Sequence, residues 1–310
     1  MRLAVPISAR GEATILSEAG ASEFYCGTQT ELWQEAFGNH DSISRRQGSA
    51  NVSTLDELAN IVTETISLNS PLFLTVNGNY TQEQLPYVTE LVAAFEDMGG
   101  TGVMVADISL LISLQKRSSR LVRGLSLLAA VSNRSALGFF SELGVTRVVL
   151  PRFLTPFQIS EIIKYFPDIR GESIVWLDKC TCIDGYCRFI HSVGYRDYPD
   201  CTCVATQAIY SYDTTYRLPA CFELFGAPSS RLPACAACSI KTLTDAGISI
   251  FKLGGRGRSL ETRLNGVRFL SRAAGTTDRK KIKAEYARII GEPCNPELCY
   301  HNLEEERVCH

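Results

Sequence analysis

The chain contains 12 cysteines in 310 residues, and most of them fall in one stretch between residues 180 and 238. Cys180-x6-Cys187 opens this stretch, Cys203 follows, and Cys235 lies near its end. Thiolates are ligands for zinc and for the irons of iron–sulfur clusters. A metal site, disulfide bonds and the burial of inert thiols are the three explanations for such a concentration.

The composition favours the metal site. The net charge of -2 and the hydrophobic fraction of 45% are ordinary for a globular protein and indicate no bulk nucleic-acid binding. No apolar run is long enough to cross a bilayer, and residues 1–10 do not have the pattern of a signal peptide. We therefore expect a cytoplasmic protein without membrane contact, in which thiols stay reduced and bind metal. Spacing alone leaves the choice between a 4Fe–4S cluster and zinc open.

Short apolar runs alternate with amphipathic stretches along the chain. Strands are expected at 2–6, 23–27, 72–77, 102–107, 124–129, 147–152, 173–177 and 248–253. Helices are expected at 11–20, 55–66, 82–98, 110–115, 133–143, 155–165, 239–246 and 259–273, and residues 28–50 read as a long loop. This alternation predicts an α/β fold, and the eight units favour a closed (β/α)8 TIM-type barrel over an open doubly wound sheet.

Two parts of the chain are expected outside the simple alternation. The barrel should occupy residues 1–275 and carry a cysteine-rich insert at 178–238, which follows the seventh strand. Residues 276–310 should form a C-terminal helix and a cysteine-containing tail.

Polar residues follow several of the expected strands at their carboxyl ends, where barrel enzymes carry their active sites. The candidates for catalysis and substrate contact are Asn77, Asp107, Arg152 and Asp178, with Asn133 as a further contact candidate. Each of them could instead cap a helix or form a structural ion pair.

A glycine-rich turn with two arginines lies between the eighth strand and a helix that Ser259 should cap. Its residues Gly255, Arg256 and Arg258 predict a site for an anionic ligand such as a carboxylate or a phosphate, because glycines permit close approach and a helix N-terminus favours anions. The alternative is a tight turn with solvated arginines. No His-Glu-x-x-His or Gly-x-Ser-x-Gly motif supports hydrolysis.

Several stretches, taken together and in order, resemble the collagenase-like peptidase family U-32 over residues 2–273. Residues 20–27 are similar to its G-A-D-x-x-Y-x-G motif, and residues 73–77 to its third strand. Residues 149–155 are similar to V-L-P-R-E-L-S, and residues 251–256 to F-K-I-E-G-R. Gly254 and Phe153 stand where those two motifs have glutamate, so a substrate handled by these carboxylates would differ here.

The resemblance implies an iron–sulfur protein that catalyses or assists oxygen-independent hydroxylation. Family members act on ubiquinone precursors and RNA bases, and some RNA members use prephenate as hydroxyl donor. By resemblance, Cys180, Cys187, Cys203 and Cys235 hold a 4Fe–4S cluster, with zinc as the runner-up. The expected substrate is a small anionic or aromatic molecule, and a homologous partner subunit is compatible with the resemblance. A peptidase or a non-catalytic iron–sulfur subunit are the alternatives.

The other cysteines of the stretch and the tail have no assigned role. They could hold a second metal site, offer an alternative ligand set, or do neither; they are Cys182, Cys201, Cys221, Cys238, Cys294, Cys299 and Cys309.

Replacing any one of Cys180, Cys187, Cys203 and Cys235 by alanine should remove the brown cluster absorption and expose residues 180–238 to proteolysis, because metal binding supplies much of the folding free energy of such an insert. Cys182→Ala, Cys201→Ala and Cys238→Ala should retain most of the iron. Iron analysis after anaerobic purification measures both. Loss of iron in Cys238→Ala together with its retention in Cys203→Ala would contradict this ligand set.

Overall fold

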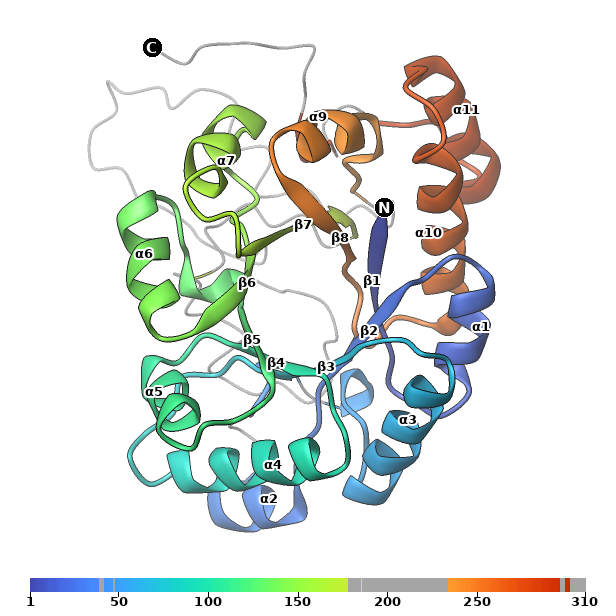
Figure 1. The fold of residues 1–310 in the computed structure, drawn as a ribbon. Coiled ribbons are helices and arrows are strands. Elements are labelled where there is room, and N and C mark those ends of the chain that lie inside the picture. Colours follow the sequence, from blue (N-terminus) through green and yellow to red (C-terminus); the bar gives the residue numbers. More distant parts are fainter. Residues whose placement is uncertain (39–41, 47, 178–184, 186–233, 296–298, 302–310) are drawn as a thin grey trace, which may run out of the picture.

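Eight parallel strands form a closed barrel, in which β1 pairs with β2 and so on until β8 pairs with β1 (Figure 1). The computed structural model describes residues 1–38, 42–46, 48–177, 185, 234–295 and 299–301. Helices surround the barrel, and strands and helices alternate along the chain. The predicted (β/α)8 barrel is therefore confirmed, and the open sheet is excluded.

The strands are β1 (Arg2–Pro6), β2 (Glu23–Cys26), β3 (Leu72–Val76), β4 (Gly102–Val105), β5 (Val122–Leu125), β6 (Val145–Val149), β7 (Arg170–Trp176) and β8 (Ile248–Leu253). The α-helices are α1 (Glu12–Glu18), α2 (Glu31–Phe37), α3 (Leu55–Ser67), α4 (Leu85–Asp97), α5 (Ile108–Lys116), α6 (Arg134–Glu142), α7 (Pro156–Ile163), α9 (Ile240–Asp245), α10 (Leu260–Ala273) and α11 (Arg279–Ile290). Short 3-10 turns are η1 (Gly48–Ala50), η2 (Leu127–Ala129) and η6 (Ala237–Ser239). Among the described residues, no helix has both the length and the apolar character needed to cross a membrane.

Side-chain caps explain where many of these helices begin. Thr54 caps α3 and Ser259 caps α10, each by accepting a backbone N–H from the first turn of the helix. Such caps satisfy N–H groups that have no partner within the helix. The Ser259 cap agrees with the one expected from the sequence.

Two sequence expectations were wrong. Residues 28–50 are not one long loop, because they contain α2, whose N-terminal Thr30 side chain accepts the Trp33 N–H at 3.2 Å. Trp33 is buried and packs against Phe37, with 4.8 Å between the ring centroids. The fifth strand also ends earlier than expected, at Leu125, because Ser126 caps the η2 turn that follows.

Helices α10 and α11 lie side by side against the wall of the barrel (Figure 1). Trp176 at the end of β7 contacts Phe269 of α10 and Tyr286 of α11, with ring centroids 4.9 and 5.9 Å apart. Gly266 makes this approach possible, since a Cβ atom there would lie 2.4 Å from the Trp176 indole nitrogen. The aromatic cluster thus joins α11, the helix after the barrel, to α10 and to the end of β7.

The interior of the barrel contains a network of charged side chains. Arg147 of β6 bonds to Glu23 of β2 at 2.5 Å and to Glu172 of β7 at 2.6 Å. Lys252 of β8 bonds to the second oxygen of Glu172 at 3.0 Å. The Arg147 guanidinium also lies over the Phe73 ring, 4.2 Å from its centroid. Four strands are therefore joined by one set of buried ion pairs.

The pKa values of these groups follow from burial and from their partners. Burial raises the pKa of Glu23, and the attraction of Arg147 offsets this only in part. Burial also opposes ionisation of Glu172, but Arg147 and Lys252 outweigh it and lower the pKa of this carboxyl. Burial lowers the pKa of Lys252, against the attraction of Glu172. Glu172 is therefore the carboxylate that the network holds ionised.

Arg147→Met should lower the free energy of unfolding by ~3–5 kcal/mol, because it leaves buried carboxylates without their partner. The matched control is Arg120→Met, which removes an arginine whose side chain is 85% exposed in its pair with Glu96. That change should cost less than about 1 kcal/mol. Equilibrium unfolding in urea compares the two variants, and equal stabilities would contradict a structural role for the network.

Candidate functional site

A cavity of about 140 Å³ lies at the carboxyl ends of the strands. Its walls come from β2, β3, β4, β6, β7 and β8, from the loops that follow them, and from the turn after β5. In (β/α)8 barrels this end carries the active site. We call it the mouth cavity.

Cationic side chains dominate the charge of the mouth cavity. Arg45, Arg46, Arg152, Lys252 and Arg256 line it, and no aspartate or glutamate belongs to the lining that the structure describes. Low-dielectric walls with charges of one sign concentrate the field on a ligand of the opposite sign. The cavity is thus built for an anionic group.

Arg256 is held in a fixed position at this cavity. Its Nη1 donates to the Thr75 hydroxyl at 2.6 Å and its Nη2 to the Ser44 carbonyl at 2.7 Å. Burial and the neighbouring Arg46 lower the pKa of Arg256 to about 10, so the guanidinium remains charged at neutral pH. Gly255 has φ +94°, a left-handed conformation that suits glycine, and it turns the chain before Arg256.

Gly27 leaves the space that the Arg256 side chain occupies. A Cβ atom at residue 27 would lie 2.3 Å from Arg256 Nη1 and 2.7 Å from the Ser44 hydroxyl. Gly27 follows β2, whereas Arg256 follows β8, so two distant stretches of the sequence fit together here. The glycine of the first motif and the arginine of the last motif are therefore parts of one site.

Lys252 is a site residue that was not among the candidates chosen from the sequence. It lines the mouth cavity, and its Nζ lies 3.8 Å from the centroid of the Tyr25 ring while it bonds to Glu172. The Tyr25 hydroxyl donates to the Leu253 carbonyl at 2.7 Å, which fixes the ring. The available signal was a charged residue, Lys252, next to the end of the largely apolar strand Ile248–Leu253.

The predicted polar candidates are divided between the mouth cavity and the helix ends. Asn77 and Arg152 line the cavity. The Asn77 amide donates to the Ser126 hydroxyl at 3.2 Å, and its oxygen has no hydrogen-bond partner in the described part of the chain. Asp107 and Asn133 cap α5 and α6, and neither is a lining residue. Asp178 lies outside the described residues.

Arg258 does not line the mouth cavity, although Gly255 and Arg256 do. Its backbone N–H donates to the Gly255 carbonyl at 3.0 Å and closes the turn. The structure thus brings together two of the three residues expected to hold an anion.

Only one of the four cysteines assigned to the cluster, Cys235, can be placed. Cys180, Cys187 and Cys203 lie outside the described residues, as do Cys182, Cys201, Cys221 and Cys309. Cys235 forms an antiparallel bridge with Trp176 at the end of β7. Its thiol faces a second, small cavity together with Cys238, Cys294 and Cys299, and none of these four lines the mouth cavity. Thiols are the right donors for a cluster, and among the described residues the thiols that share this cavity with Cys235 are Cys238, Cys294 and Cys299.

The thiols around Cys235 influence one another. Burial, together with the nearby Cys299, Cys294 and Cys238, raises the pKa of Cys235 to about 12. In the described part of the chain, no group of three or more metal-ligating side chains is already gathered in a coordinating arrangement.

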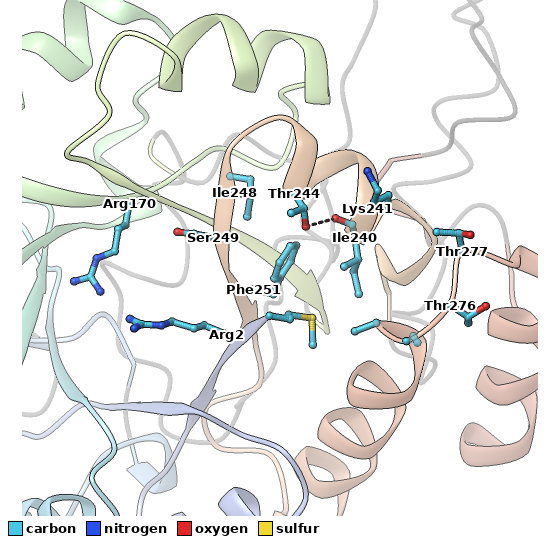
Figure 2. A pocket seen from close by; sticks show the side chains of 14 residues that line it. Arg2, Arg170, Ile240, Lys241, Thr244, Ile248, Ser249, Phe251, Thr276 and Thr277 are labelled. Atoms are coloured by element: carbon cyan, nitrogen blue, oxygen red, sulfur yellow. Dashed lines mark hydrogen bonds between the residues drawn. The ribbon is translucent and has the colours of Figure 1, made fainter.

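A larger cavity of about 850 Å³ lies at the opposite end of the barrel, next to Arg2, Arg170 and Phe251 (Figure 2). Figure 2 shows Arg2 and Arg170 extending to the same side, away from Phe251. This is the amino-terminal face of the strands, which in (β/α)8 barrels serves stability rather than chemistry. We therefore place the candidate active site at the mouth cavity.

The fold and the mouth cavity define a (β/α)8 barrel protein with a basic site at its carboxyl end. The model of peptidase family U32 matches residues 11–299, and the chain belongs to this family.

The chain matches only part of the length of its curated relatives. This chain is 26% identical to "tRNA hydroxylation protein P1" of Bacillus subtilis over 151 positions. These positions cover 49% of this chain and 36% of that protein. It is 25% identical to "tRNA hydroxylation protein P" of Escherichia coli over 143 positions. These positions cover 46% of this chain and 31% of that protein. The matched part thus spans about a third of these relatives. The solved U32 peptidase Mk0906 is similar at 15% identity and a TM-score of 0.43, covering 56% of this chain and 68% of that one.

Gly27→Ala should weaken anion binding by ~10-fold, because the added methyl group displaces Arg256 and a lost charged hydrogen bond costs that much. The matched control is Gly138→Ala in α6, where the added Cβ would meet only the Phe166 ring at 3.7 Å. Thermal shifts with inorganic phosphate and with malonate measure the affinities. If Gly27→Ala binds both anions as the unchanged chain does, Arg256 does not supply the attraction.

Proposed function

We propose that this chain catalyses or assists the oxygen-independent hydroxylation of an aromatic or nucleobase-like substrate. The observation that carries the proposal is the mouth cavity, which is lined by arginines and a lysine without a carboxylate among its described residues. The names of the relatives, which are tRNA hydroxylation proteins, support a hydroxylation reaction.

The mouth cavity suits a small anionic reactant. Its volume of about 140 Å³ is below the ~300 Å³ at which pockets for drug-sized ligands begin. We infer that Arg256 and Lys252 bind a carboxylate or phosphate of this reactant, and that the Asn77 oxygen accepts a hydrogen bond from it. A hydroxyl donor with a carboxylate, such as the prephenate that the family resemblance implies, has this chemistry.

A 4Fe–4S cluster is the cofactor that the resemblance implies, with zinc as runner-up. Its proposed ligands are Cys180, Cys187, Cys203 and Cys235. When bound, a cluster of this type supplies single electrons. The contribution of the described residues is separate from it, since Arg256, Lys252 and Asn77 bind and orient the anionic reactant.

Hydrolysis of peptides receives no support from the described lining of the mouth cavity. Ser44 and Ser126 are present, but no histidine that could act as a base belongs to the lining that the structure describes. The Ser126 hydroxyl instead accepts the Asn77 amide and the Leu128 N–H. An activated serine needs an adjacent base, so the peptidase alternative rests on the family name.

Anaerobic incubation of the full chain with unmodified tRNA and prephenate should add one oxygen atom to a tRNA base, as detected by mass spectrometry of the digested nucleosides. Arg256→Ala and Lys252→Met should lower the yield by ~10-fold or more, because each removes a charge that binds the reactant. Arg170→Ala, at the opposite end of the barrel, is the control and should retain activity.

Two results would contradict the proposal. One is the absence of oxygen transfer to tRNA and to small aromatic acids from a preparation that contains iron and sulfide. The other is oxygen transfer that Arg256→Ala and Lys252→Met leave unchanged, because the mouth cavity would then not be the reaction site.

A further inference from the structure

The cavity of about 850 Å³ at the amino-terminal end of the barrel has no part in the hydroxylation proposed above (Figure 2). It lies between α9 and the end of α10, over the first residues of β8. Because α9 has 6 residues whereas α10 has 14, the layer of helices leaves space beside α9. Pockets for small molecules measure ~300–1,000 Å³, so this space is large enough for such a ligand. We call it the amino-terminal cavity.

The charged residues in the described lining of the amino-terminal cavity are all cationic. They are Arg2, Arg170 and Lys241. Lys241 has a carboxylate partner, since its Nζ lies 2.5 Å from Asp245 on the exposed surface of α9. The guanidinium groups of Arg2 and Arg170, by contrast, form no hydrogen bond or ion pair with the residues that the structure describes. These two arginines are therefore the cations that remain for a ligand.

Arg2 and Arg170 lie close enough to influence each other. Figure 2 shows both extending to the same side of the cavity, and the strand register places Arg170 beside Arg147 of β6. Burial, together with Arg147 and Arg2, lowers the pKa of Arg170, and the attraction of Glu23 and Glu172 offsets this only in part. Both of these carboxylates already bond to Arg147. The positive charges of Arg2 and Arg170 thus lack a carboxylate of their own in the described part of the chain.

Apolar side chains and hydroxyl groups complete the wall of the amino-terminal cavity. Its apolar lining residues include Ile240, Ile248, Phe251 and Ala273. The hydroxyl groups of Thr244 and Ser249 are engaged within the chain, since the first donates to the Ile240 carbonyl at 2.8 Å and the second to a carbonyl of β7 at 3.4 Å (Figure 2). The cavity therefore offers a ligand two guanidinium groups and an apolar wall beside them.

This combination favours a phosphate ester over other anions. Guanidinium groups bind phosphates and carboxylates through parallel hydrogen bonds. A phosphate monoester carries about −1.5 to −2 charges at neutral pH, whereas a carboxylate carries a single charge. One phosphate monoester therefore matches two arginines that have no other partner, and the apolar wall suits the organic group that the phosphate carries.

We propose that the amino-terminal cavity binds a phosphorylated small molecule, whose phosphate accepts hydrogen bonds from Arg2 and Arg170 and whose organic group packs against Phe251 and Ile240. The ligand is distinct from the reactant of the mouth cavity, which lies at the opposite end of the barrel. Because (β/α)8 barrels carry their chemistry at the carboxyl end of the strands, the amino-terminal cavity is a binding site and not a reaction site. Hydroxylation measured without this ligand does not depend on the site.

Calorimetric titration of the full chain with phenyl phosphate tests the site. Phenyl phosphate combines the doubly charged group with a ring, whereas benzoate has the ring with a single charge, so benzoate should bind at least ~10-fold more weakly. Arg2→Gln and Arg170→Gln should each lower the affinity for phenyl phosphate by ~10-fold or more, because each removes a charged hydrogen bond. Arg120→Gln is the matched control, since that side chain is 85% exposed in its pair with Glu96.

Hydrogen exchange locates the bound ligand without any variant. Phenyl phosphate should slow the exchange of backbone amides in residues 240–249 and 273–277, which include lining residues of the amino-terminal cavity. The proposal is overturned if phenyl phosphate does not bind, if it protects only the segments that line the mouth cavity, or if benzoate binds as tightly. It is also overturned if Arg2→Gln and Arg170→Gln bind phenyl phosphate like the unchanged chain.

Discussion

The buried ion pairs between Arg147, Glu23, Glu172 and Lys252 are the constraint on which the rest of the structure depends. Barrels of this fold usually fill their interior with layers of branched apolar side chains. Here the Arg147 side chain is 2% exposed, and the removal of such charges from water costs several kcal/mol per ion. That cost is offset only while β2, β6, β7 and β8 keep these side chains within reach of one another, so the network fixes the relative positions of strands far apart in sequence.

The same network reaches the mouth cavity through Lys252. The ammonium group of Lys252 lies between Glu172 and the Tyr25 ring. Arg256 donates to the Thr75 hydroxyl and to the Ser44 carbonyl. The charges that face a ligand are therefore set by the frame of the barrel rather than by mobile surface side chains. A site ordered in advance loses less conformational freedom when the ligand binds, which favours affinity for a small anion.

The strands were predictable because they are short apolar runs between turns, as in Leu72–Val76. The α2 helix was not, since it is only 7 residues long and Trp33 is its one buried residue, which gives little periodic signal. In the site, Arg256 could be found from its glycine-rich turn. Its contact with the space left by Gly27, and the thiol neighbours of Cys235, depend on pairings between distant segments that spacing within one segment does not reveal.

Tyr300 contacts both Cys235 and the mouth-cavity residue Arg152. Its backbone N–H donates to the Cys235 carbonyl, and the centroid of its ring lies 5.8 Å from the guanidinium carbon of Arg152, which lines the mouth cavity. A displacement of the C-terminal segment would therefore move an aromatic ring beneath a cation of the mouth cavity. By thermodynamic reciprocity, a ligand that changes the position of Arg152 would change the stability of the C-terminal segment by the same coupling free energy. Residues 299–301 thus couple the position of the C-terminal segment to ligand binding in the mouth cavity.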